Sequence, residues 1–313
     1  MRPMLATKGT NVPTGGEWSH EVKWDGVRIL ADAGADPGAD PAGRVRMTSR
    51  NDNDVTAAWP ELCESPLGGR DLLVDGEVIA LNERGVPDFR VLQDRMHTRN
   101  ATTARRLSQQ VPATFMIFDL LRLDGSDLTD LPLEKRREVL SGLDLAGSTW
   151  QVPASYDDGA MLFDATLQQG LEGIVSKRLS SRYVFGQRTP HWLKFAHRHR
   201  LSYVVGGWRP QEGTTSRLGA VLVGQPTATG LMYRGRVGSG IGGKVSAALS
   251  DLLAPLERAD SPFADDVPRI DTLGTHWVEP RVVIDVDTHG VGYTRLRQPS
   301  FQGVRHDLVA EDL

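Results

Sequence analysis

The hydrophobic pattern of the chain changes near Arg198, and this change constrains the fold more than any other feature. Before it, alternating apolar runs are mixed with segments of helical periodicity, which indicates an α/β region. After it, short β runs are punctuated by glycine, with one helical segment near residues 244–258. We therefore predict two domains, residues 1–199 and residues 200–313, the second a small β-barrel with one helix. A chain of 313 residues is long enough for each domain to bury its own core.

Individual segments follow from the same periodicities. In the first domain we expect strands at residues 19–30, 44–49, 72–81 and 114–121, and helices at residues 88–95, 133–143 and 158–169. A stretch rich in Gly, Ala, Asp and Pro predicts a hairpin loop at residues 33–43. In the second domain we expect strands at residues 202–208, 220–223, 231–237 and 282–287.

Composition excludes several classes of protein. A net charge of −4 argues against a histone-like protein that coats nucleic acid by bulk charge. Basic side chains gather at residues 182–200 and 295–306, where either a solvated surface or a local DNA contact would account for them. No apolar run is long enough to span a bilayer. The single cysteine, Cys63, excludes an intramolecular disulfide, and the N-terminus lacks a secretory apolar core, so we expect a reducing cytosol.

Lys23 stands between apolar neighbours at the end of an expected strand, directly before an Asp-Gly turn. A lysine amine attacks phosphorus only when it is neutral, so its pKa must fall from about 10.4 through desolvation or nearby cations. Candidate cations are Arg28, Arg50 and Lys194. The Lys-x-Asp-Gly string by itself fits a surface lysine before a turn better than a nucleophile, so it needs support from other motifs.

Further strings supply that support. They are residues 49–51 (Ser-Arg-Asn), 75–77 (Asp-Gly-Glu), 118–121 (Phe-Asp-Leu-Leu), 172–177 (Glu-Gly-Ile-Val-Ser-Lys) and 192–195 (Trp-Leu-Lys-Phe). In order and spacing they resemble the nucleotidyltransferase motifs of ATP-dependent DNA ligases, RNA ligases and mRNA capping enzymes. Residues 297–307 resemble the last motif of bacterial non-homologous end-joining ligases. The chain is therefore similar to bacterial ATP-dependent DNA ligases of the LigC/LigD type.

This resemblance implies an α/β (α+β) nucleotidyltransferase, or adenylation, domain followed by a small all-β OB-fold barrel domain. It also implies a reaction in three steps. Lys23 attacks the α-phosphate of ATP to give lysyl-AMP, the AMP passes to the 5′-phosphate of a nick in duplex DNA, and the 3′-hydroxyl displaces it. Adenylation makes sense because a 5′-phosphate is a poor electrophile until it carries a good leaving group. The expected activity is nick sealing, in DNA repair.

The resemblance also assigns roles to residues. The catalytic group consists of Lys23, Arg28, Arg50 and Lys194. Adenosine would be held by Glu21, which accepts from the exocyclic amine, by Phe118 and Val175 on the two ring faces, by Glu77 on the ribose, and by Lys177. Mg²⁺, or Mn²⁺, would be held by Glu172 and Glu77, because hard cations prefer oxygen ligands. Pyrophosphate would be oriented by Arg305 and Asp307 of the second domain, followed by a domain movement.

Two positions depart from the family pattern. The fifth motif usually has a second lysine where this chain has Ala196, which leaves Lys194 as the main phosphate contact, with His197 or Arg198 as substitutes. The last motif commonly ends in lysine where this chain has Leu308. The first departure predicts slower lysine adenylation, and the second predicts weaker triphosphate binding.

Three strings invite other interpretations that we do not adopt. Residues 238–245 nearly match a P-loop, but Val245 stands where that loop needs a hydroxyl, and a glycine turn into a helix is simpler. Residues 285–289 hold two aspartates and a histidine, which alternation along a barrel strand explains without a metal. His197 and His199 lack a nearby third ligand for zinc.

Competing functions are an RNA ligase or GTP-using capping enzyme, and a non-catalytic DNA-binding module of the same fold. The Phe-Asp-Leu-Leu string and residues 297–307 favour the DNA ligase, and the presence of Lys23, Glu77, Glu172 and Lys194 disfavours a non-catalytic module. Expected partners are nicked duplex DNA and, by family analogy, Ku or a repair polymerase or primase. We expect a monomer in the bacterial cytoplasm, associated with the nucleoid and not with a membrane.

Overall fold

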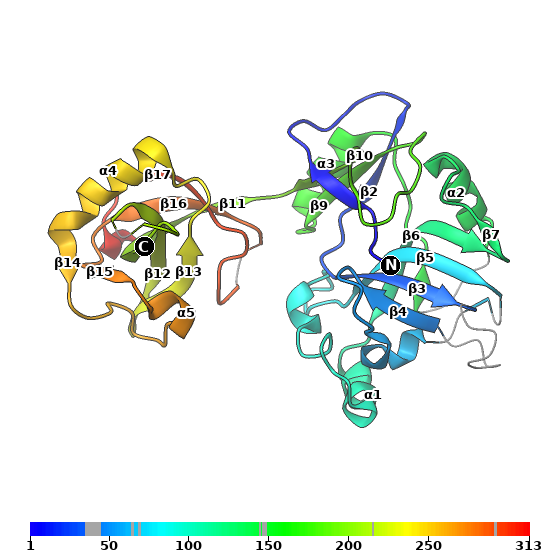
Figure 1. Ribbon diagram of the computed structural model, residues 1–313, viewed down its shortest axis with the longest axis horizontal. Coiled ribbons are helices and arrows are strands. Elements are labelled where there is room, and N and C mark those ends of the chain that lie inside the picture. The colour runs from blue at the N-terminus through cyan, green and yellow to red at the C-terminus, as the bar shows by residue number, and fades with distance from the viewer. Residues whose placement is uncertain are drawn as a thin grey trace. The chain divides into compact units, whose positions relative to one another are not determined.

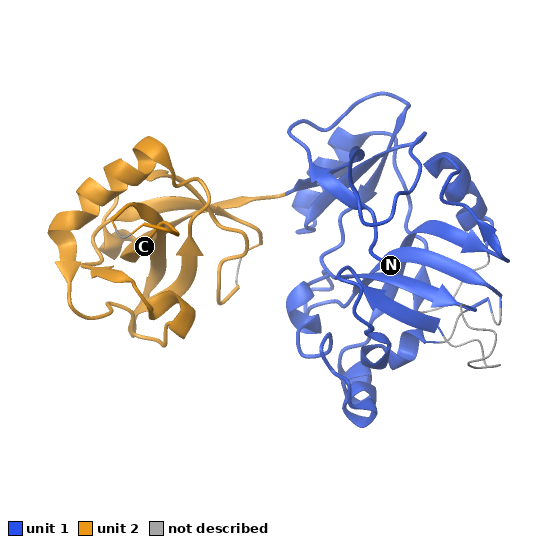
Figure 2. Cartoon of the chain, viewed as in Figure 1, with its two compact units in different colours: residues 1–196 blue, residues 197–313 orange. Residues whose placement is uncertain are grey.

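The chain forms two compact units, Met1–Ala196 and His197–Leu313, in a computed structural model (Figure 2). The structure describes residues 1–34, 45–63, 66–67, 70–143, 145, 149–214, 216–290 and 293–313. The domain boundary expected from the sequence, after residue 199, falls inside the first strand of the second unit and stays a prediction. No helix in these described ranges is long and apolar enough to cross a membrane.

The first unit contains a four-stranded sheet that one helix covers on a single face (Figure 1). Side chains alternate between the two faces of each strand, which explains this arrangement. Ile174 and Phe195 pack against Leu162 of the helix, while their neighbours along each strand face the other way. The polar face is therefore left to the functional site. The helix is α3 (Gly159–Gln168), and the strands, in order across the sheet, are β1 (Leu5–Lys8), β10 (Arg188–Ala196), β9 (Gly173–Arg178) and β2 (Trp18–Val22).

A second, six-stranded sheet in the same unit encloses the largest apolar cluster, built around Trp59, Phe115 and Trp150. Its strands are β4 (Val45–Ser49), β3 (Val27–Ala33), β5 (Leu72–Ile79), β6 (Thr114–Leu123), β7 (Ser126–Asp127) and β8 (Trp150–Gln151). Its helices are η1 (Thr56–Ala58), η2 (Pro60–Leu62), η3 (Phe89–Leu92), α1 (Ala101–Gln110) and α2 (Leu133–Ser141).

Most of the predicted elements of this unit are confirmed, with three corrections. The extended segment expected at residues 19–30 is two strands from different sheets, because the turn at residues 23–26 separates β2 from β3. The helix expected at residues 88–95 is only the short 3-10 helix η3, whose start is capped by the Asp88 carboxylate. Helix α1 is mostly polar, with Ala104 as its one buried residue, and was not expected. The hairpin loop expected at residues 33–43 lies largely outside the described residues.

The second unit is a seven-stranded antiparallel sheet with a helix against its core (Figure 1). The four predicted strands and this helix are present, while the strands Glu257–Arg258, His276–Val278 and Ser300–Val304 and the short helix Arg269–Thr272 were not expected. Leu249 and Leu253 of that helix pack against Val205 and Val221 of the sheet. The helix expected at residues 244–258 ends earlier and gives way to a 3-10 turn and a short strand. The elements are β11 (His199–Pro210), β12 (Leu218–Thr227), β13 (Gly230–Val237), α4 (Gly243–Leu253), η4 (Ala254–Leu256), β14 (Glu257–Arg258), α5 (Arg269–Thr272), β15 (His276–Val278), β16 (Val283–Thr288), β17 (Ser300–Val304) and η5 (Ala310–Asp312).

The structure explains two of the sequence strings for which we did not adopt another interpretation. Residues 238–245 lead from β13 into α4, with Gly242 as the N-cap, and β13 pairs antiparallel with β12, so no βαβ unit surrounds them. In β16, Ile284 and Val286 are buried while Asp285 and Asp287 are only half-buried, which is the alternation expected of a barrel strand. Among the described residues, no cluster of three or more potential metal-ligating side chains exists.

Candidate functional site

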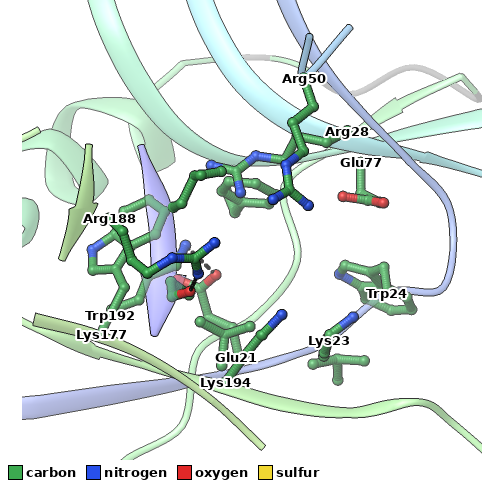
Figure 3. Close-up of a pocket in the computed structure, with 15 residues that line it drawn as sticks. Glu21, Lys23, Trp24, Arg28, Arg50, Glu77, Lys177, Arg188, Trp192 and Lys194 are labelled. Carbon is green, nitrogen blue, oxygen red and sulfur yellow. Dashed lines mark hydrogen bonds and ion pairs between the residues drawn. The ribbon is translucent and has the colours of Figure 1, made fainter. Parts of the chain in front are cut away.

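A pocket with a volume of about 180 Å³ lies in the first unit, where side chains from both sheets meet (Figure 3). Each sheet presents to the pocket the face that lies opposite its own apolar cluster. Nine of the residues assigned from the resemblance line this pocket: Glu21, Lys23, Arg28, Arg50, Glu77, Phe118, Val175, Lys177 and Lys194. The site is therefore assembled from segments that lie far apart along the chain.

Strand register places three of these side chains in one row. Val175 of β9 stands opposite Glu21 of β2 on one side and opposite Lys194 of β10 on the other. Residues directly opposite each other in antiparallel strands point to the same face of the sheet. Two residues further along each strand, Lys177 lies opposite Trp192 on that same face. Residues that stand two apart within a motif thus point to the same face of the sheet, and together they form one surface of the pocket.

Lys23 lies just beyond the end of β2 and forms an ion pair with Glu172, with 2.5 Å between Nζ and the nearer carboxylate oxygen. The Lys23 amide also donates to the carbonyl of Gly173, 2.8 Å away, so the backbones of the two motifs are joined directly. The Lys23 side chain is only partly exposed, at 22%. The amine is thus held at the pocket, with a carboxylate beside it.

Glycines next to these two residues permit the close approach. A Cβ atom at Gly26 would lie 2.2 Å from the Val78 carbonyl oxygen, which no side chain can tolerate. Gly173 has φ of +140°, and a Cβ atom there would lie 2.0 Å from the Phe195 carbonyl oxygen. Any larger residue at either position would push Lys23 away from its neighbours, so steric exclusion explains the glycine in both strings.

Arg28 is held in place by a buried hydrogen-bond network. Its Nε and Nη2 donate to the two carboxylate oxygens of Asp75 at 2.7 and 2.6 Å, and Nη2 also donates to the Met4 carbonyl at 3.0 Å. The Tyr183 hydroxyl donates to Asp75 at 2.6 Å and accepts from the Met4 amide. Burial opposes the charge of Arg28, but the Asp75 carboxylate outweighs it and raises the pKa of the guanidinium. The guanidinium is thus a fixed positive charge at the pocket.

Lys177 and Glu21 form a second, almost fully buried ion pair with an N···O distance of 2.7 Å. The Lys177 ammonium lies 4.2 Å from the ring centroid of Phe118 and 4.4 Å from that of Trp192. Burial lowers the pKa of Lys177, while Glu21 and Asp119 act in the opposite direction. The other oxygen of Glu21, Oε1, is buried and has no hydrogen-bond partner among the described residues. This end of the pocket therefore offers a bound molecule an unused acceptor, a cationic donor and aromatic surface.

Two further side chains titrate abnormally at the pocket. Burial raises the pKa of Glu77 to about 8, although the positive charges of Lys23 and Arg28 oppose the shift. Burial also lowers the pKa of Lys194, and the positive charges of Lys23, Arg188 and Arg50 lower it further. The pocket thus concentrates cations around a carboxyl group whose pKa is raised by burial.

Glu172 and Glu77 were the expected metal ligands. Glu172 does not line the pocket but pairs with Lys23, and its charge contributes to raising the pKa of Glu77. Mg²⁺ is usually held by one or two protein carboxylates together with phosphate oxygens and water. Two neighbouring carboxyl groups beside a pocket fit such a site, provided that a phosphate supplies further oxygen ligands.

Arg305 and Asp307 belong to the second unit. Arg305 donates from Nε and Nη2 to the two oxygens of Asp307 at 2.8 and 2.6 Å, and the Asp307 side chain is 65% exposed. Leu308, which departs from the family pattern, packs at the edge of an apolar cluster around Phe263. Apolar packing thus accounts for leucine at this position.

Several pocket residues were missed as site residues in the sequence: Leu5, Ala6, Val22, Trp24, Arg188 and Trp192. Strand alternation could have found Trp192, because it stands two residues before Lys194. Trp24 directly follows Lys23, and Arg188 lay in a basic run that the sequence assigned either to a solvated surface or to a local DNA contact. Asp75 was noted within its motif, but its pairing with Arg28 joins two adjacent strands and is not visible in a single sequence.

Two family profiles match the chain. The ATP dependent DNA ligase domain matches residues 3–195, and the ATP dependent DNA ligase C terminal region matches residues 214–308. The chain therefore belongs to the ATP-dependent DNA ligase family. The predicted fold, a nucleotidyltransferase domain followed by an OB-fold domain, and the predicted enzyme class are confirmed.

Similar proteins agree with this membership. The multifunctional non-homologous end joining protein LigD of Mycobacterium bovis is 37% identical over 312 residues, which cover 98% of this chain and 39% of that protein. LigD of Pseudomonas aeruginosa is 31% identical over 322 residues, which cover 96% of this chain and 35% of that protein. The chain thus spans little more than a third of the length of these relatives.

Solved structures give the same result for the fold. A mycobacterial DNA ligase D complexed with ATP and MES is 35% identical with a TM-score of 0.57, and the match covers 100% of this chain and 97% of that one. The ligase domain of Mycobacterium tuberculosis LigD is 36% identical with a TM-score of 0.55 and the same coverage. The predicted resemblance to LigD is confirmed.

Proposed function

We propose that this chain seals nicks in duplex DNA by way of AMP bound covalently to Lys23. In the first step the Lys23 ammonium loses its proton to water, and the neutral amine attacks the α-phosphorus of ATP. A bond forms between Nζ and phosphorus, the bond to the bridging oxygen breaks, and pyrophosphate leaves. The observation that carries this proposal is the position of Lys23, which lies at a pocket lined by Arg28, Arg50, Arg188 and Lys194. Cations that surround a pocket in this way stabilise charge that develops on phosphate oxygens.

Adenine is the base that the buried end of the pocket suits. The unused Glu21 Oε1 can accept a hydrogen bond from the exocyclic amine of adenine, and the Lys177 ammonium can donate to a ring nitrogen. Guanine would present a carbonyl oxygen to Glu21 and an N–H group to Lys177, which pairs acceptor with acceptor and donor with donor. Phe118 and Val175 supply apolar contacts for the faces of the base. The solved relative that was complexed with ATP is consistent with this choice.

We assign the phosphate and metal contacts to the remaining residues. Lys194 and Arg50 would contact the α-phosphate and the departing pyrophosphate, while Glu77 would hold the ribose hydroxyl. Glu172, with Glu77, would hold Mg²⁺ or Mn²⁺. When bound, such an ion would polarise phosphate oxygens and neutralise their charge. Arg305 and Asp307 would orient pyrophosphate during lysine adenylation.

The biological setting is proposed from the relatives alone. The relatives are named as multifunctional non-homologous end joining proteins, so we assign this chain to repair of broken DNA in bacteria. Its partners would be nicked duplex DNA and, through the same pathway, Ku or a repair polymerase or primase. We expect a monomer that works in the cytoplasm at the nucleoid.

The experiment that tests the first step uses ATP labelled at the α-phosphate. The protein is mixed with labelled ATP and Mg²⁺ and separated on a denaturing gel, alongside Lys23→Ala and the control Lys8→Ala, which removes an exposed lysine of the same unit. We expect label on wild type and Lys8→Ala and none on Lys23→Ala. Label retained equally by Lys23→Ala would refute the proposal, and label from GTP instead of ATP would favour a capping enzyme. Pyrophosphate treatment beforehand removes AMP already attached.

Nick sealing requires a separate measurement. A duplex with one nick, carrying a labelled 5′-phosphate, should become a longer strand with wild type and ATP. A nick that already carries AMP on its 5′-phosphate needs no lysine nucleophile, so Lys23→Ala should still seal it. A wild-type protein that takes up AMP but seals neither substrate would refute DNA ligation and retain only nucleotidyl transfer.

A further inference from the structure

The indole nitrogen of Trp24 is a buried donor without an explained role. Trp24 directly follows Lys23 and lines the pocket, yet its Nε1 is buried and has no hydrogen-bond partner in the part of the chain that the structure describes. Two tryptophans that are buried as whole residues do have partners: Trp150 donates to the Leu62 carbonyl and Trp192 to the Ser181 hydroxyl, both at 3.3 Å. An N–H group that is removed from water without a partner destabilises the fold, so the exception needs a reason.

Trp59 provides the informative comparison. Its Nε1 is also buried and lacks a partner among the described residues, but Trp59 belongs to the large apolar core, with the Arg95 guanidinium 4.8 Å from its ring. No bound molecule can reach a nitrogen in that position. The Trp24 nitrogen, in contrast, lies beside a pocket that a nucleotide would fill, and Figure 3 shows it directed toward the interior of that pocket. A ligand atom can therefore complete its hydrogen bonding.

The position of Trp24 identifies the part of the ligand it would meet. The turn that carries Trp24 touches Glu77, since a Cβ atom at Gly26 would lie 3.0 Å from the Glu77 Cγ. Figure 3 separates Trp24, Lys23 and Glu77 from Glu21 and Lys177, which we assigned to the base. Trp24 is thus at the end where the ribose and the α-phosphate would lie. Both groups present oxygen acceptors, and an indole N–H can only donate.

We propose that the Trp24 indole N–H is a nucleotide-binding donor, which bonds to an oxygen of the ribose or of the α-phosphate during lysine adenylation. This inference rests on the proposed function and adds a specificity-determining residue to it. Because the donor is already buried and fixed by the turn next to the nucleophile, the bond would orient the sugar-phosphate relative to Lys23 with little loss of freedom on binding.

The test removes the N–H group of residue 24 and retains an aromatic side chain at this position. We would compare wild type with Trp24→Phe and with β-(3-benzothienyl)alanine at position 24, which keeps the indole shape but has no N–H. The rate of enzyme adenylation is measured against concentration for ATP, 2′-deoxy-ATP and 3′-deoxy-ATP. We expect both variants to raise KM for ATP about tenfold, the value of one hydrogen bond.

The deoxy analogues identify the acceptor. If a ribose hydroxyl accepts, one analogue is already impaired in wild type, and the Trp24 variants impair it no further. If the α-phosphate accepts, the variants impair all three nucleotides equally and also lower kcat. Either pattern supports the proposal.

Trp59→Phe is the matched control, because it removes an indole whose nitrogen lies away from the pocket; it should leave KM unchanged. An unchanged KM for ATP in both Trp24 variants, with adenylation of wild type intact, would overturn this inference but leave the proposed function standing. A wild-type protein that takes up no AMP would overturn both.

Discussion

The two units hold their predicted site residues in different ways. In the first unit two of the charged pairs are largely buried: Lys177 and Glu21 are 2% and 3% exposed, and Asp75 holds Arg28 through two hydrogen bonds. In the second unit Arg305 and Asp307 pair with each other at the surface, where the aspartate is 65% exposed. A buried pair holds its side chains in place before a ligand binds. An exposed pair contributes little free energy, so a ligand can replace one partner at little free-energy cost. The first arrangement suits a rigid binding pocket, and the second suits residues that act only in one step.

The largest effect should come from breaking a buried pair behind the pocket. Arg136 donates from Nε and Nη2 to the two oxygens of Asp119 at 2.7 and 2.8 Å, and both side chains are fully buried. Asp119→Asn leaves the guanidinium without its counter-charge, so we expect the free energy of unfolding to fall by about 3 kcal/mol or more. Urea denaturation measures this. Asp124→Asn, which breaks an exposed pair with Arg70, is the control and should change nothing measurable.

The pocket should also give stability an unusual dependence on pH. The pKa of Glu77 is raised to about 8, so between about pH 4 and pH 8 the folded protein holds a proton that the unfolded chain releases. The free energy of unfolding therefore falls as pH rises through this window, by at most about 1.4 kcal/mol per pH unit. Glu77→Gln should remove this slope in thermal or urea unfolding. If wild type and variant respond to pH in parallel, Glu77 is ionised in the folded protein.

A smaller effect is expected from the support of Arg28. Tyr183→Phe removes the hydroxyl that donates to Asp75 and accepts from the Met4 amide. The free energy of unfolding should fall by about 1 kcal/mol. Enzyme adenylation should also slow, because Asp75 then holds Arg28 less firmly. Tyr156→Phe, an exposed tyrosine of the same unit, serves as the control. Slower adenylation without loss of stability would mean that the hydroxyl acts on the substrate directly.

The smallest change in stability is expected in the second unit. Asp307→Asn should leave urea denaturation unchanged, since the pair with Arg305 is exposed. It should nevertheless slow the formation of labelled enzyme from ATP, while sealing of a nick that already carries AMP proceeds normally. A loss of stability comparable to that of Asp119→Asn would remove the distinction between the two units.

The sequence predicted the architecture because periodicity and glycine placement are local signals. It also predicted most of the pocket, since Lys23, Glu77 and Lys194 lie in recognisable strings. It could not predict which partner holds each charge. Glu172 pairs with Lys23, Asp75 with Arg28 and Glu21 with Lys177 only because strands from different parts of the chain meet in a particular register. Trp24 was missed for a related reason, since the burial of one nitrogen atom depends on packing.

The row formed by Glu21, Val175 and Lys194 limits the changes of sequence length that these strands can accept during evolution. Because side chains alternate between the two faces of a strand, removing one residue from β9 would turn Ile174 and Ser176 toward the nucleotide and send Val175 and Lys177 beneath α3. Substitutions change single side chains, but a single-codon deletion in this strand exchanges the residues that face the pocket with those that face α3. We therefore expect length variation among descendants to collect in the loops and to spare these strands.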